Sequence, residues 1–211
     1  MKRRPVWMIL GLAAIVGCGS SNASNSKIVL PTVQTADESQ PSVAHPEYVN
    51  WSQFEEKASI VRKRLVENAN GTVVVTTKMW LDKKDENEVR VGSQVTVERP
   101  NEPAVENDVD IVRYPATYRL PKGMEESRFY LPSAKAKETG TESVKIGDDE
   151  FETKVFEWEE NNESGPMTVK LWRSDKIPGK IVRQELLTKS SATKSTEKII
   201  ELRLSSVSIK K

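Results

Sequence analysis

Apolar residues between positions 51 and 65 recur every three or four residues, which is the spacing of one face of an α-helix. They are Trp51, Phe54, Ala58, Val61 and Leu65. The pattern predicts an amphipathic helix that packs this face on the rest of its domain.

Residues with suitable capping chemistry flank this segment. Ser52 and Glu55 have the spacing of a capping box at a helix start. Gly71, in the stretch "NANG", can supply the left-handed conformation that ends a helix. We therefore expect the helix to begin near Ser52 and to end at "NANG".

After Thr72 the apolar pattern changes to alternation, which is the period of a β-strand with one buried face. Residues 72–81 and 89–98 alternate in this way, and "DVDIVRYPATYRLP" predicts a strand that bends or ends at Pro115. Four more strand candidates follow, with turn sequences between them: 144–146 with 151–159, 167–172, 180–187 and 197–209. In the turn "KIPGK", Pro178 suits the second position of a type II turn and Gly179 suits the third.

These elements predict an α+β fold, with one N-terminal amphipathic helix packed on a curved, mainly antiparallel sheet of about seven strands. Short connections between the strands favour antiparallel neighbours. We place this single globular domain at residues 50–211, a length that can bury a core without disulfides.

The first residues have the features of an export signal. Lys2, Arg3 and Arg4 precede the uncharged segment "VWMILGLAAIV", whose length fits the apolar core of a signal peptide. The segment is shorter than the roughly 18 apolar residues of a membrane-spanning helix. We therefore expect the chain to be exported.

The single cysteine, Cys18, follows this segment after one residue, Gly17. The residues "Ile15-Val16-Gly17-Cys18" resemble the lipobox of bacterial lipoproteins, in which the cysteine sulfur is acylated and the chain is cut before it. The thiolate is a strong nucleophile, which suits this modification. The resemblance implies a lipoprotein signal peptide at residues 1–17 and lipidation of Cys18. The alternative is cleavage by an ordinary signal peptidase after Ala23, which would discard the cysteine.

The same resemblance implies a location. Two or more acyl chains give stable attachment to a membrane. Gly19 follows Cys18, and by the enterobacterial sorting rule a residue other than aspartate permits export to the outer membrane. We expect a protein anchored by lipid at the outer membrane, facing the periplasm or the cell surface. Residues 18–49 are polar and rich in Ser and Pro, and predict a flexible polar tether.

Charge and residue content argue against several function classes. Loss of residues 1–17 would change the net charge from +1 to −2, and a nearly neutral surface does not attract nucleic acid. The single histidine, His45, lies in the expected tether, which argues against histidine catalysis and a Cys/His zinc site. Gly-rich phosphate loops and the motifs H-E-x-x-H and G-x-S-x-G do not occur. We expect no enzyme activity, no catalytic residues, no metal site and no cofactor.

The segment 145–185 resembles a stretch found in small uncharacterised lipoproteins of planctomycete type. The matching residues are Trp172, Ser174, Pro178, Gly179, Val182, Arg183 and Glu185. This resemblance implies no activity. More loosely, one helix followed by a long antiparallel meander is similar to the half-barrel of lipoprotein carriers, the LolA-like fold, which binds acyl chains between sheet and helix. Function does not follow from fold alone.

Two hypotheses of function remain. In the first, the chain is a lipid-anchored cell-envelope lipoprotein with a non-catalytic binding or structural domain. In the second, it is a carrier or sensor of a hydrophobic, lipid-like ligand, and Trp80, Trp158 or Trp172 lines a cavity on the concave face of a half-barrel. The expected partners are the membrane, through acyl chains on Cys18, and an envelope protein or a lipid ligand, but not nucleic acid.

Overall fold

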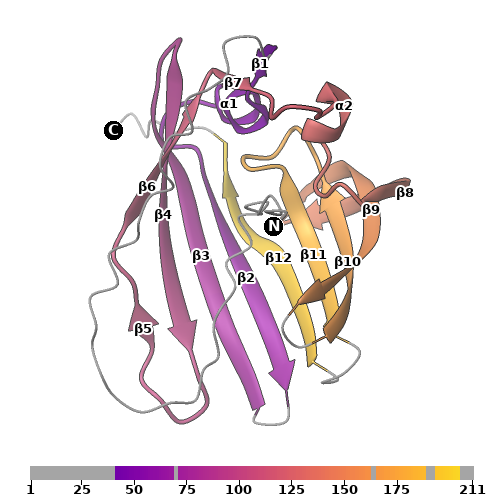
Figure 1. Ribbon diagram of the computed structural model, residues 1–211. Helices are drawn as coiled ribbons and strands as arrows, with labels where there is room; N and C mark the ends of the chain where they lie inside the picture. The colour runs from indigo at the N-terminus through magenta and orange to yellow at the C-terminus, as the bar shows by residue number, and fades with distance from the viewer. Residues whose placement is uncertain (1–40, 69–70, 163–164, 189–192, 205–211) are drawn as a thin grey trace, which may run out of the picture. The chain divides into compact units, whose positions relative to one another are not determined.

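The computed structural model describes residues 41–68, 71–162, 165–188 and 193–204 (Figure 1). The expected signal peptide, Cys18 and most of the expected tether lie outside these residues. The elements are β1 (Ser42–Ala44), α1 (Pro46–Trp51), β2 (Ser59–Asn68), β3 (Gly71–Lys84), β4 (Glu88–Glu98), β5 (Val105–Glu106), β6 (Asp110–Pro115), β7 (Thr117–Arg119), α2 (Glu126–Phe129), β8 (Lys137–Ile146), β9 (Asp149–Asn162), β10 (Gly165–Arg173), β11 (Ile181–Thr188) and β12 (Thr193–Arg203).

Ten of these strands form one antiparallel sheet. Its order is β5-β4-β3-β2-β12-β11-β10-β9-β8, and β6 pairs with β4 beyond this path. Most neighbours are also neighbours in the chain, but β2 and β12 come from opposite ends of the described region and lie side by side (Figure 1). Strand β12 therefore joins an N-terminal half, β2 to β6, to a C-terminal half, β8 to β11. A separate two-stranded sheet pairs β1 with β7.

The sheet is curved, and its core lies where the curvature brings distant strands together. Strands β8 and β12 contact each other although β11, β10 and β9 lie between them in the sheet. The largest cluster of buried side chains consists of Ile60, Ile146, Phe151, Val155, Trp172, Ile177, Val182 and Ile199. These residues come from six strands, β2 and β8 to β12, and from the turn before β11. Side chains therefore fill the curved sheet at this place.

Two smaller clusters complete the core. Helix α1 packs on β3 and β4 through Trp51, which is fully buried together with Leu81, Val89 and Val91. The third cluster contains Phe156, Trp158, Val169 and Leu171 of β9 and β10. Full burial of aliphatic side chains of this size stabilises the fold by about 1.5–3 kcal/mol each.

The predicted fold class is wrong: the described residues form nearly all sheet, with two short helices, rather than α+β with a long amphipathic helix on seven strands. Residues 59–68, expected to be helical, form β2, which pairs with β3 on one side and β12 on the other. The apolar residues spaced by three and four belong to three different elements: Trp51 ends α1, Phe54 and Ala58 lie in the following loop, and Val61 and Leu65 lie on β2.

The residues that suggested a helix at 51–71 have other roles in the structure. Within β2, Ile60 and Arg62 are buried while Val61 and Lys63 are only half-buried, which is the alternation of a strand. Ser52 follows the last residue of α1 and caps its C-terminus, so it does not begin a helix. Gly71 has the expected positive φ of 112°, but it begins β3 instead of ending a helix.

The strands predicted after residue 72 are present. Strands β3, β4, β6 and β8 to β12 cover the alternating segments, and β12 is described as far as Arg203. Gly179 has a φ of 68°, and the Lys180 N–H donates to the Ile177 carbonyl over 2.9 Å, which confirms the turn predicted at Pro178–Gly179. Residues 41–49, which the sequence suggested as part of the tether, include β1 and most of α1.

Candidate functional site

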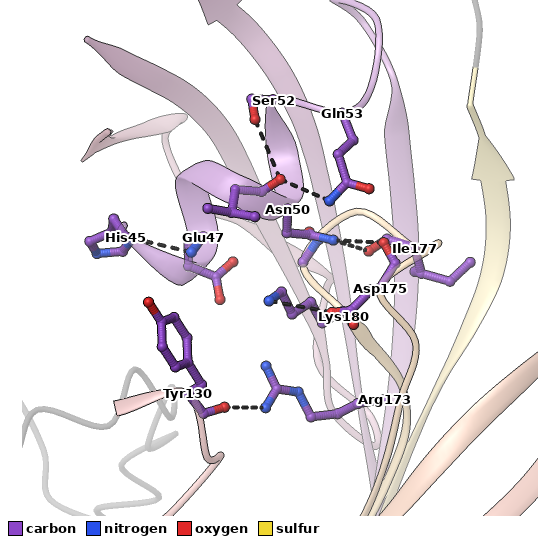
Figure 2. Close-up of polar contacts among 12 residues, drawn as sticks. His45, Glu47, Asn50, Ser52, Gln53, Tyr130, Arg173, Asp175, Ile177 and Lys180 are labelled. Atoms are coloured by element: carbon purple, nitrogen blue, oxygen red, sulfur yellow. Dashed lines mark hydrogen bonds and ion pairs between the residues drawn. The ribbon is translucent and has the colours of Figure 1, made fainter. Parts of the chain in front are cut away.

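Helix α1 begins at a histidine that acts as its cap. The His45 Nδ1 atom accepts a hydrogen bond from the Glu47 N–H over 3.1 Å, and Pro46 occupies the first helical position, where a missing N–H costs nothing. The cap fixes Glu47 in the first turn, with its carboxylate directed away from the helix (Figure 2).

A buried asparagine ties α1 to the turn before β11. The Asn50 side chain is fully buried, and its Nδ2 atom donates to the carbonyls of Asp175 and Ile177 over 3.1 and 3.0 Å. Its Oδ1 atom accepts from the Gly179 N–H over 2.6 Å. Three hydrogen bonds from one side chain therefore hold the turn against the helix, and they position Lys180.

Four charged residues, which we call the charged cluster, face one another next to α1: Glu47 of α1, Arg62 of β2, Arg173 of β10 and Lys180 of the turn (Figure 2 labels all but Arg62). Glu47 acts electrostatically on both Arg62 and Arg173. Lys180 pairs with Asp175 over 3.4 Å, but the Asp175 side chain is 80% exposed, so this pair is weak. In the described part of the chain, no ion pair joins Glu47 to a cation.

Arg62 is the most buried member of the charged cluster. It is 8% exposed, and its Nη2 atom donates to the Gly179 carbonyl over a long 3.4 Å. Its Nε atom has no acceptor among the described residues. Burial lowers the pKa of Arg62, and the carboxylate of Glu197 opposes that shift. Glu197 also binds Arg64 over 2.6 Å, so its negative charge is shared between the two arginines.

Five rings form an aromatic surface beside the charged cluster. Tyr118 and Phe129 stack with centroids 5.1 Å apart, Tyr130 meets Phe129 edge-on, and His45 contacts Tyr114, Tyr118 and Phe129. Tyr118 and Tyr130 are 41% and 37% exposed. The Tyr130 carbonyl accepts a hydrogen bond from Arg173 Nη1 over 3.1 Å, which connects the aromatic surface to the charged cluster.

The titration of two of these rings reflects their surroundings. Burial, and then the positive charge of Lys180, lower the pKa of His45 below its usual 6.5. Burial and the negative charge of Glu47 raise the pKa of Tyr114 to about 12, against a smaller opposing effect of Arg62. Both side chains are therefore uncharged at neutral pH.

The three tryptophans suggested for an apolar cavity lie in different places. Trp172 belongs to the largest core cluster and donates from Nε1 to Glu142 over 2.7 Å. Trp158 belongs to the third cluster, beside a surface depression whose other lining residues are mainly charged. Trp80 lies over Gly92 in another open depression, which has Lys57, Lys78 and Arg203 at its edge. The structure does not bring the three together.

The sequence reasoning missed most of the site. Cys18, the predicted lipidation site, lies outside the described residues. The sequence analysis places His45 in the expected tether, although "HPE" has the Pro-at-N1 pattern of a helix start, which is a signal that locates α1. Nothing in the sequence indicates that Arg62, Tyr114 and Arg173 meet, because strand pairing far along the chain brings them together.

The described residues contain neither a membrane-spanning helix nor a cluster of metal ligands. None of their helices has the length and apolar character needed to cross a bilayer. In the same segments, no three side chains of His, Cys, Asp or Glu come together as metal ligands would.

Comparison with known proteins finds similarity in structure alone. No protein-family model matches the sequence, and no curated protein matches it. Solved structures with a similar arrangement include a "putative exported protein" with a YmcC-like fold from Bacteroides fragilis, at 11% identity and a TM-score of 0.46, covering 71% of this chain and 97% of that one.

A "putative lipoprotein" from Parabacteroides distasonis is similar at 12% identity and a TM-score of 0.41, covering 71% of this chain and 96% of that one. A "putative outer membrane lipoprotein-sorting protein domain" from Vibrio parahaemolyticus has 9% identity and a TM-score of 0.28, covering 78% and 94%. All three TM-scores are below 0.5, so the similarity carries no conclusion about this chain.

Proposed function

We propose that the chain is an exported, lipid-anchored protein of the bacterial cell envelope whose sheet domain binds a ligand or partner without catalysing a reaction. The lipobox residues Ile15 to Cys18 support the anchor, and Gly19 supports the outer membrane as its location. Because two or more acyl chains give stable attachment, the domain would act at the membrane surface.

The observation that carries the binding role is the meeting of the charged cluster and the aromatic surface next to α1. Several partly exposed rings lie beside Arg62 and Arg173, two arginines without an ion pair among the described residues. These are features of a recognition site, because aromatic side chains and arginine dominate binding energies. The second hypothesis, a carrier of a lipid-like ligand, has less support. Side chains fill the curved sheet around Ile177, and the depression beside Trp158 is mainly lined by charges.

Fractionation of cells tests the anchor. The wild-type chain is expected in the membrane fraction and labelled by radioactive palmitate, whereas Cys18→Ser is expected to lose the label and the membrane attachment. Ser20→Ala, two residues away, is the matched control and should behave as wild type. A wild-type chain that is soluble and unlabelled would contradict the proposal.

Photo-crosslinking in intact cells tests the binding role. A photoreactive amino acid at Tyr118, on the aromatic surface, should give a reproducible adduct with a small molecule or an envelope component. The same amino acid at Ile200, an exposed position on β12 with 48% exposure, is the control. Equal yields of the same products at both positions would mean that the aromatic surface is no special binding site.

A further inference from the structure

The positive charges at the charged cluster outnumber the negative charges that act on them. Arg62, Arg173 and Lys180 are three cations, and the carboxylates that act on them are Glu47, Asp175 and Glu197. Glu197 also binds a fourth cation, Arg64. Asp175 is largely exposed, and Glu47 makes no ion pair within the described residues. With Arg64 included, four cations share three carboxylates, so the charged cluster and its neighbour Arg64 are short of one negative charge.

Buried donors without acceptors lie at the same place. The Arg62 guanidinium is nine-tenths buried, and its Nε atom has no acceptor. The Trp51 Nε1 atom also has none among the described residues, and the Trp51 ring lies beside Gly179, as Arg62 does. A buried guanidinium without a paired anion is costly, so a ligand that supplies acceptor oxygens would relieve the cost.

The aromatic surface offers an apolar wall next to these donors. Arg173 connects the two, because its guanidinium donates to the Tyr130 carbonyl while its charge lies in the field of Glu47. Tyr118 and Phe129 stack, Tyr130 meets Phe129 edge-on, and the rings of Tyr118 and Tyr130 are partly open to solvent. A ligand with one negative charge and a flat apolar part would satisfy both regions at once.

We infer that the charged cluster binds the carboxylate group of a small organic acid, whose apolar part rests on Tyr118, Phe129 and Tyr130. A single carboxylate supplies the missing negative charge and acceptor oxygens for the fork of Arg62 and for Lys180. This inference rests on the proposed binding role and names the chemical class of the ligand.

Calorimetric titration of the full chain, purified from whichever cell fraction holds it, tests the inference. The probe is 3-phenylpropionate, with 3-phenyl-1-propanol as a matched neutral compound, acetate as a carboxylate without the ring, and phenyl phosphate as a different anion. We expect 3-phenylpropionate to bind about tenfold or more tightly than each of the other three, because hydrogen bonds to charged groups and ring contacts both contribute.

Variants separate recognition from folding. Arg62→Met removes a buried, unpaired charge with little change in volume, so the melting temperature of the ligand-free chain should stay the same or rise. The same variant should weaken binding of 3-phenylpropionate about tenfold or more. Lys180→Met should also weaken it, whereas Arg203→Gln, at a position whose side chain is 71% exposed on β12, should not.

Three results would overturn the inference. They are equal binding of 3-phenylpropionate and its alcohol, tighter binding of phenyl phosphate, and an Arg62→Met variant that folds and binds as wild type. Crosslinking at Tyr118 that persists while none of the acids binds would reject the carboxylate and leave the proposed function standing. Loss of membrane attachment alone would affect the anchor and leave the ligand result intact.

Discussion

Trp80 of β3 and Gly92 of β4 are paired across the two strands. The indole ring of Trp80 occupies the space that a side chain at position 92 would need. A Cβ atom at position 92 would lie 2.2 Å from Trp80 Cε2 and 2.4 Å from Cζ2, well inside van der Waals contact. The ring covers the backbone of β4 at this point, which compensates for the missing side chain in the strand.

Replacing this glycine should be costly only while the indole is present. Gly92→Ala should destabilise the fold by about 1–3 kcal/mol, because the ring must turn away from the new methyl group. In a Trp80→Ala background the same change should be neutral or slightly stabilising, since alanine suits a strand better than glycine. Urea unfolding of the four chains measures the coupling, and additive effects would contradict the account.

His45 should make the domain sensitive to mild acid. Burial and the positive charge of Lys180 lower the pKa of His45 below 6.5. The Nδ1 atom must stay unprotonated to accept the hydrogen bond from the backbone N–H of Glu47. As the pH falls below 6.5, the unfolded chain therefore binds a proton that the folded chain resists, and this contribution to stability is lost.

The substitution His45→Asn tests this sensitivity, because asparagine caps helices well and does not titrate. Thermal unfolding should give similar stabilities for the two chains at pH 7.5. Between pH 6.5 and about 5, the wild type should lose more stability than His45→Asn. Parallel curves for the two chains across this range would exclude His45 as the cause.

The contact between α1 and the turn before β11 depends on Asn50 as a single residue. Asn50→Ala leaves the carbonyls of Asp175 and Ile177 and the N–H of Gly179 without their partner. Since Asn50 is fully buried, we expect a loss of about 2–5 kcal/mol in the free energy of unfolding. Gln53→Ala removes an exposed side-chain bond to Val49 of the same helix, and should cost less than about 1 kcal/mol in the same denaturation assay.

Local chemistry predicted some elements well and others poorly. The Pro178–Gly179 turn could be predicted because its backbone preferences reside in the two residues themselves. Strands β3 and β4 could be predicted because they alternate over ten residues or more. The segment from Trp51 to Leu65 misled because a short helix, a loop and a strand together imitate the helical period.

The charged cluster could not be predicted because its members depend on the whole sheet. Arg62 and Arg173 are separated by more than a hundred residues, and they approach only because β12 places β11 and β10 beside β2. In the sequence each arginine is one of many charges on a strand with no signal to distinguish it. The organisation of the sheet, and not any motif, therefore creates the candidate site.

We expect strand β12 to be the element that makes the two halves of the sheet unfold cooperatively. It pairs with β2 on one edge and β11 on the other, so the two halves of the sheet meet only through it within the described order. Ile199 and Ile200 are adjacent on this strand, where its register with β2 shifts, and 6% and 48% of their surfaces are exposed. Ile199 belongs to the largest core cluster, together with Ile60 and Ile177.

Aspartate at these two positions should therefore have opposite outcomes. Ile199→Asp places an unpaired carboxylate among apolar side chains, and the cost of several kcal/mol is a large part of the 5–15 kcal/mol that typically stabilises a domain. We expect this variant to lose its near-ultraviolet circular dichroism and cooperative unfolding, whereas Ile200→Asp should keep both. If Ile199→Asp unfolds cooperatively at the wild-type midpoint, β12 does not hold the two halves together through that cluster, and the charged cluster would need another explanation for its assembly.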